Sequence, residues 1–191
     1  MKKTLLLLLV VALAVLSLAA CQEEINTDLN PYSDAVARTF PTSIRVETTY
    51  TDDTFDVTLQ GVYTATYNGD GSATVVYEFD KLNPAGSANL YDKVSGTVTI
   101  AADGTVSGSL DETVAAAVRL SLNLDASKMS YSIDRGILTA DISAENTKSV
   151  LGVALGSAAK LDMRLAGDVI GSYTVNYSTA TGSAKIVCIY N

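Results

Sequence analysis

Few residues of this chain can carry out chemistry, because its 191 residues include no histidine and only two cysteines. Without histidine, neither a Ser-His-Asp nor a Cys-His arrangement can form, and a zinc site loses one of its usual ligands. The segment Ser157-Ala158-Ala159-Lys160 matches the S-x-x-K motif of penicillin-recognising serine enzymes. Those enzymes also need a Lys-Thr-Gly strand, which the sequence does not contain. We therefore interpret this match as a helix end or a loop.

The carboxylates show no catalytic or metal-binding pattern. Asp52, Asp53 and Asp56 could offer oxygen atoms to calcium, but their spacing is not that of an EF-hand loop, and a turn before a strand explains them. Glu78 and Asp80 fall on the predicted outer face of a strand, where solvated carboxylates are expected. We therefore predict a protein that is not an enzyme and has no catalytic residue, metal or cofactor.

Cys21 stands where a covalent modification is expected. Lys2 and Lys3 precede an apolar run of 12 residues, Leu5–Leu16, which is too short for a membrane span of about 20 residues but fits a signal-peptide core of about 7–15. The following Leu18-Ala19-Ala20-Cys21 resembles the lipobox of bacterial lipoproteins, in which small residues precede the cleaved bond and the thiol accepts a diacylglycerol. This resemblance implies that residues 1–20 are a cleaved signal peptide. Cys21 would then carry a lipid with palmitate-type acyl chains. This lipid anchor would hold the mature protein to a membrane, on the side facing away from the cytoplasm.

The charge of the mature chain limits its partners. Cleavage after residue 20 removes two lysines and leaves 11 basic against 21 acidic residues, a net charge of −10. Such a chain repels phosphate backbones, so we expect no nucleic-acid partner. The same charge repels anionic lipid headgroups and keeps the domain away from the membrane surface. Lipidation of Cys21 leaves Cys188 alone in an apolar segment, where we expect a buried thiol.

Alternating polarity predicts a mainly β fold. Residues 21–41 are expected to form an acidic tether and a brief helix, Tyr32–Phe40, and residues 42–191 a single antiparallel β domain. The clearest strand runs over Phe55–Tyr67, and Gly61 is expected to mark a bend or bulge in it.

The hairpin loops can be predicted from the requirement that large apolar side chains share one face. A three-residue loop, Gly69–Gly71, pairs Tyr63 with Tyr77 and supplies glycine at the left-handed position. The same argument predicts a loop at 102–104, which pairs Ile100 with Val106 and Val98 with Gly108. It also predicts a four-residue loop at 179–182, which pairs Tyr177 with Ala184 and Tyr173 with Cys188.

The remaining segments complete a sheet of about nine or ten strands with one to three short helices. Arg119–Leu124 alternates as a strand would, whereas Asp111–Val118 and Asn146–Leu155 favour helices. Short connections indicate an antiparallel meander, which must curl or be covered to bury its apolar face. We expect a curved half-barrel with a helical plug, with a closed barrel as the alternative.

Two stretches and the overall layout resemble small uncharacterised lipoproteins of Gram-positive gut bacteria. The stretches are Phe40-Pro41-Thr42 and Tyr77-Glu78-Phe79-Asp80-Lys81-Leu82-Asn83, together with a tyrosine-rich final hairpin. In fold alone, the pattern is also similar to curved-sheet lipoproteins that carry an acyl chain between sheet and helix. These resemblances imply an anchored location and transfer no residue other than Cys21.

Five tyrosines fall on the apolar sides of the two clearest hairpins and are our candidate ligand-binding residues: Tyr63, Tyr67, Tyr77, Tyr173 and Tyr177. If those sides line an unfilled cavity, its apolar walls and few hydroxyls suit a lipid or other amphiphile. The alternative is a packed core. The leading hypothesis is a lipid-anchored carrier of an amphiphilic ligand, and the alternatives are a surface interaction module and a carboxylate-dependent hydrolase.

Overall fold

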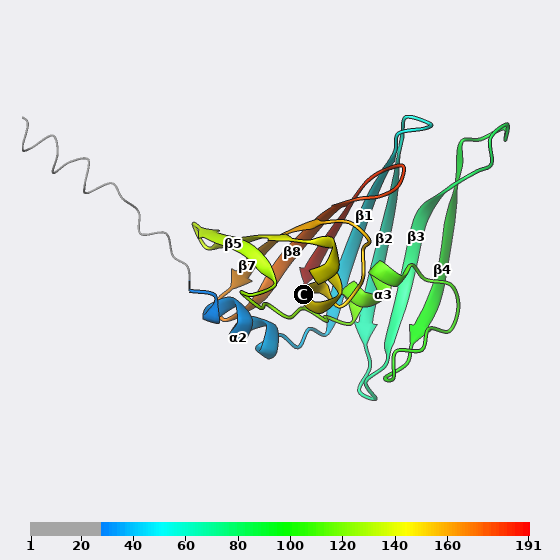
Figure 1. Ribbon diagram of the computed structural model, residues 1–191. Coiled ribbons are helices and arrows are strands. Elements are labelled where there is room, and N and C mark those ends of the chain that lie inside the picture. Colours follow the sequence, from blue (N-terminus) through cyan, green and yellow to red (C-terminus); the bar gives the residue numbers. More distant parts are fainter. Residues whose placement is uncertain (1–27) are drawn as a thin grey trace, which may run out of the picture.

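The computed structural model describes residues 28–191 (Figure 1). The predicted signal peptide 1–20, the anchor Cys21 and most of the tether lie outside these residues. Within the described residues, no helix is long and apolar enough to cross a membrane.

The described chain forms one curved antiparallel sheet in which the first and last strands pair at the centre. The strands occur in the order β4-β3-β2-β1-β9-β8-β7-β6-β5. Two meanders, β1–β4 and β5–β9, are therefore joined by the pairing of β1 with β9. The edge strands β4 and β5 do not pair with each other, so the sheet is open, as the half-barrel prediction requires. The nine strands are β1 Ser43–Asp52, β2 Val57–Tyr67, β3 Ala73–Leu82, β4 Tyr91–Ile100, β5 Met129–Asp134, β6 Ile137–Ile142, β7 Ala159–Ala166, β8 Val169–Ser178 and β9 Gly182–Tyr190.

The predicted hairpin registers are confirmed in two cases and partly in the third. Tyr63 pairs with Tyr77 across a loop whose Gly71 has a φ of 83°. Tyr173 pairs with Cys188, which is fully buried. The third hairpin is reduced to an isolated bridge between Ile100 and Val106, and the ladder of β4 is formed with β3.

Gly61 was expected to mark a bend or bulge, but the register of β2 against β1 runs through it without a shift. A Cβ atom at this position would lie 2.8 Å from the Tyr63 ring and 2.6 Å from Thr48 Oγ1. Glycine is therefore needed here because the tyrosine ring lies across the strand, and a side chain would occupy the same space.

The predicted strand Arg119–Leu124 is wrong. Leu120 has a left-handed φ of 47°, which no strand permits, and the segment follows a helix as irregular chain. Leu122 and Leu124 are nonetheless buried. The backbone N–H of Asn123 donates to the Val150 carbonyl (2.8 Å), which ties the segment to the chain that covers the sheet. The alternation therefore reflects a covering segment that is buried on one side.

Three short α-helices complete the described fold: α2 Asn30–Arg38, α3 Glu112–Val118 and α4 Thr147–Leu151. Helix α2 begins before the predicted Tyr32 because Pro31 fits the first turn, where a missing N–H costs nothing. It is fastened to β8 through Thr39, whose hydroxyl donates to the Ala35 carbonyl (2.6 Å) and accepts from the Ile170 N–H (2.9 Å).

Helices α3 and α4 cover one face of the sheet, which we call the inner face; the opposite face is the outer face. Ala117 of α3 and Leu151 of α4 lie near Val175 and Ile186 around a space of only about 20 Å³. The centre of the half-barrel is therefore a filled core rather than an open cavity. Each large apolar side chain buried there contributes about 1.5–3 kcal/mol.

Candidate functional site

A cleft remains open at one end of the filled core. It lies between the inner face and the Ser109–Val114 segment at the start of α3, and its volume is about 420 Å³. We call it the inner cleft. Its lining combines apolar side chains with hydroxyl and carboxylate groups: Leu59, Phe79, Leu110, Val114, Ala184 and Ile186 on the apolar side, and Thr48, Thr49, Tyr50, Gln60, Tyr63, Asp80, Ser109, Asp111, Thr113, Tyr177 and Thr179 on the polar side.

Two of the predicted tyrosines, Tyr63 and Tyr177, both line this cleft, although they lie far apart in the sequence. Burial raises the pKa of both Tyr63 and Tyr177, and the nearby Asp111 carboxylate raises each further. A side-chain hydrogen bond with Thr48 lowers the pKa of Tyr63, and one with Thr113 lowers that of Tyr177. Both phenols therefore lie around the first turn of α3.

Asp111 is held in place by the helix that it starts. Its carboxylate accepts from the backbone N–H of Thr113 (2.9 Å) and of Val114 (3.3 Å), as an N-cap does. The cap fixes a negative charge at the polar wall of the cleft. The sequence indicated a helix at Asp111–Val118 but gave no signal that its first residue would lie near Tyr63 and Tyr177.

The other three predicted tyrosines do not line the inner cleft. The Tyr67 hydroxyl donates to the Val118 carbonyl, and burial raises its pKa to about 12. Tyr77 packs against Phe79 with ring centroids 5.7 Å apart. Tyr173 lies in the core, 6.1 Å from the ring of Tyr190. These three tyrosines contact neighbouring side chains and backbone within the fold and are not part of the cleft lining.

Asp80 departs from its expected solvated position. Its side chain is only 9% exposed, whereas that of Glu78 is 59% exposed. The pairing of β2 with β3 stops at Gly61, and Asp80 Oδ2 accepts from the next N–H along β2, that of Gln60 (3.0 Å). Asp80 thus bridges the two strands where they separate, and its Oδ1 lies 3.4 Å from Lys93 Nζ as an ion pair.

Thr179 supplies a polar group without a partner at the opposite side of the cleft. Its Oγ1 is buried and has no hydrogen-bond partner among the described residues. A buried hydroxyl without a partner loses its hydration without compensation. A ligand that offers a hydrogen-bond donor or acceptor there would supply the missing partner.

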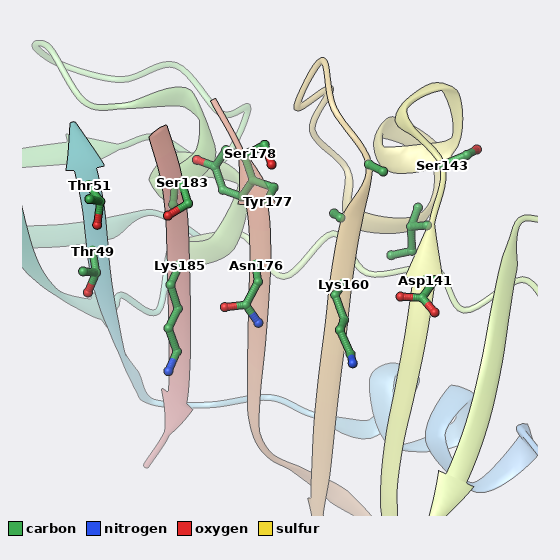
Figure 2. A pocket seen from close by; sticks show the side chains of 14 residues that line it. Thr49, Thr51, Asp141, Ser143, Lys160, Asn176, Tyr177, Ser178, Ser183 and Lys185 are labelled. Carbon is green, nitrogen blue, oxygen red and sulfur yellow. The ribbon is translucent and has the colours of Figure 1, made fainter. Parts of the chain in front are cut away.

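A second hollow lies on the outer face, and we call it the outer groove. It spans β1, β9, β8, β7 and β6 and has a volume of about 750 Å³. Figure 2 shows the side chains of Lys185, Asn176 and Lys160 side by side on three neighbouring strands. Sequence reasoning missed this groove because isolated lysines and threonines on strands resemble any solvated face. Lys160 was noted only through the S-x-x-K match, and the structure places its partner Ser157 in the loop before β7.

Asp52 stabilises the turn between β1 and β2. The buried Asp52 carboxylate accepts from the N–H groups of Thr54 (2.9 Å) and Phe55 (3.1 Å) and from the Tyr50 hydroxyl (3.2 Å). Over residues 28–191, no group of three or more acidic, cysteine or histidine residues lies close enough together to hold a metal ion.

Comparison with known proteins gives no family. No family model matches the sequence, and no curated protein matches it. Among solved structures, LprF from Mycobacterium bovis is 12% identical with a TM-score of 0.43, over 83% of this chain and 89% of that chain. A redesigned beta barrel, mFAP1, bound to DFHBI is 12% identical with a TM-score of 0.24, over 83% of this chain and 100% of that chain. Functional conclusions therefore rest on the geometry of this chain.

Proposed function

We propose that this protein is a non-enzymatic, lipid-anchored binding protein that holds an amphiphilic ligand in the inner cleft outside the cytoplasm. The observation that carries the proposal is the two-sided lining of the cleft. Leu59, Leu110 and Ile186 offer an apolar surface, while Tyr63 and Tyr177 offer hydroxyls at the start of α3. Apolar walls with a few fixed polar groups are the usual composition of a small-molecule site.

The polar wall favours a particular kind of head group. Asp111 places a negative charge beside the two phenols, and Thr179 offers a hydroxyl without a partner. A head group that donates hydrogen bonds, such as a hydroxyl or an amine, would complement these groups. An anionic head group would be repelled by the negative charge of the Asp111 carboxylate.

Helix α2, which follows the proposed anchor in the sequence, and the inner cleft lie at opposite ends of the domain. Helix α2 is fastened to Ile170 at the beginning of β8, whereas the cleft lies beside Thr179, just beyond its end. A ten-residue strand spans about 30 Å. The lipid on Cys21 would therefore hold the α2 end near the membrane, with the inner cleft facing away from it.

The ligand can be sought by comparing natural protein with a variant whose cleft is filled. Host membranes carrying the protein are excised in polymer discs, the protein is purified, and its solvent extract is analysed by mass spectrometry. Leu110→Trp places a large ring in the cleft, and Leu90→Trp is the matched control because Leu90 is 44% exposed and does not line the cleft.

An amphiphile enriched in wild type and Leu90→Trp, and depleted in Leu110→Trp, is the expected result. Bilayer lipids enter all three extracts equally, so the comparison removes them. Identical extracts from three variants of equal melting temperature would contradict ligand binding in the cleft.

A further inference from the structure

The strand register aligns the polar residues of the outer groove in one row. Thr49 pairs with Lys185, Lys185 with Asn176, Asn176 with Lys160, and Lys160 with Asp141. Directly opposed residues on neighbouring strands project to the same side of a sheet. Lys160 and Lys185 are thus two strands apart, about 10 Å between backbones, with the Asn176 amide between them (Figure 2).

Both lysines of this row lack an acidic partner. In the described part of the chain, neither ammonium group lies within 4 Å of a carboxylate oxygen. Other cations on the outer face do have such a partner. Arg45 Nη2 lies 2.8 Å from Glu47 Oε1, and Lys93 Nζ lies 3.1 Å from Glu78 Oε1. The groove holds two lysines against one acid, Asp141, on a chain whose net charge is −8. It is therefore a local positive site on an acidic protein, and it would attract an anion.

The rest of the groove is lined by small side chains and hydroxyls. Ala158 contributes to the hollow because it fills little space, and Thr51, Ser178 and Ser183 line it with hydroxyls. These groups donate and accept hydrogen bonds, as does the Asn176 amide. They match a ligand that itself carries several hydroxyls.

We propose that the outer groove binds a saccharide or polyol that carries one anionic group. The anion lies over Asn176 between the ammonium groups of Lys160 and Lys185, whose flexible stems can converge on it. The hydroxyls of the ligand face the serine and threonine hydroxyls. Phosphate and carboxylate share this chemistry, and the probes below separate them.

The test uses the mature lipoprotein purified in a polyoxyethylene detergent, which carries neither sugar nor charge. Calorimetric titrations compare glucose 6-phosphate, glucuronate, glucose and inorganic phosphate. We expect at least one anionic sugar to bind about tenfold more tightly than both glucose and inorganic phosphate, because each simpler probe makes part of the contacts. Equal affinity for glucose, or for inorganic phosphate, would overturn the proposal.

The lysines are tested individually with a matched control. Lys160→Ala and Lys185→Ala should each weaken binding of the preferred anionic sugar about tenfold. Lys148→Ala removes the same charge from an exposed position on helix α4, outside the groove, and should leave binding unchanged. Unchanged affinity in both groove variants, or an equal loss in Lys148→Ala, would refute the site. Lys160 and Lys185 do not line the inner cleft, so this result is independent of the amphiphile experiment.

Discussion

The ring of Tyr63 lies across the backbone of Gly61, two residues earlier on β2, and a Cβ atom at Gly61 would come within 2.8 Å of that ring. This contact positions the phenol at the wall of the inner cleft. Gly61→Ala should therefore displace Tyr63 and destabilise the protein by about 1–3 kcal/mol, the usual range for overpacking. Urea unfolding measures the change.

Gly69→Ala is the control, because Gly69 lies in an exposed turn with nothing within 4 Å of an added Cβ. It should change the free energy of unfolding by less than Gly61→Ala does. Equal effects of the two substitutions would show that the Tyr63 contact has no part in the result.

Asp111 has two roles that two substitutions separate. Asp111→Ala removes the N-cap of α3 and should cost about 1 kcal/mol in urea unfolding, whereas Asp111→Asn retains a capping side chain and should cost less. Because the Asp111 charge raises the pKa of Tyr63 and Tyr177, Asp111→Asn should lower the pKa of both phenols. Carbon-13 NMR of labelled tyrosine measures these pKa values.

Glu112→Gln removes a neighbouring charge without touching the cap and serves as the control. Asp111, and not Glu112, is the carboxylate that raises the pKa of these phenols, so in Glu112→Gln their pKa values should stay close to those of wild type. An equal fall in both variants would mean that net charge, rather than the position of Asp111, governs the phenols.

Cys188 should be almost unreactive in the folded protein. Burial raises the pKa of its thiol from 9.0 to about 12, against a smaller lowering by a hydrogen bond with Tyr173. The thiolate fraction at pH 8 then falls by about a thousandfold, and the closed core adds a further barrier. An Ellman-type assay on mature protein should detect one thiol, and only after unfolding in urea.

The Cys188→Ala variant makes this assay informative about the anchor as well. If Cys21 carries the proposed thioether, the assay should detect no free thiol in this variant, whether the protein is folded or unfolded. A thiol that reacts rapidly in this variant would be that of Cys21, and it would contradict lipidation.

Alkaline pH should destabilise the fold through the same region. Burial raises the pKa of Cys188 and of Tyr67 to about 12, and it also raises those of Tyr173 and Tyr190. Near pH 7 these groups are protonated in both states, so stability does not depend on them. As the pH rises through 9 and above, the unfolded chain loses protons that the folded chain retains, and the free energy of unfolding falls until Cys188 and Tyr67 also ionise in the folded chain near pH 12.

Urea titrations at pH 8, 9, 10 and 11 test this dependence. Cys188 alone contributes at most about 1.4 kcal/mol for each pH unit in that window, and Cys188→Ala should flatten the slope by that amount or less. A free energy of unfolding that is constant or rises from pH 9 to 11 would contradict the sign.

The local part of this architecture was predictable from the sequence. The facing of Tyr63 and Tyr77, and of Tyr173 and Cys188, follows from apolar side chains sharing one face, and the observed registers agree. Such pairings are enforced by the turn between the two strands. The pairing of β1 with β9 has no turn to enforce it, and no pattern near Val46 indicates Cys188 as its partner.

The candidate sites were predictable only in part, for the same reason. Tyr63 and Tyr177 were selected by their face, but their place in one cleft depends on the pairing of β1 with β9, which puts β2 and β8 in one sheet, and on the start of α3 lying beside them. The row of Lys185, Asn176 and Lys160 depends on the registers of two separate hairpins. The alternation of Leu122 and Leu124 led to the wrong prediction of a strand, because an irregular segment that covers a sheet can also bury alternate residues.

The central place of the last strand affects how the chain can mature. A polypeptide that emerges with its amino end first cannot complete the pairing of β1 until Gly182–Tyr190 has also emerged. Contacts of this kind form slowly, and slow folding would suit the proposed export of this chain in an unfolded state. A product that ends before β9 would leave two unprotected strand edges in the middle of its sheet, where quality-control proteases and aggregation both act.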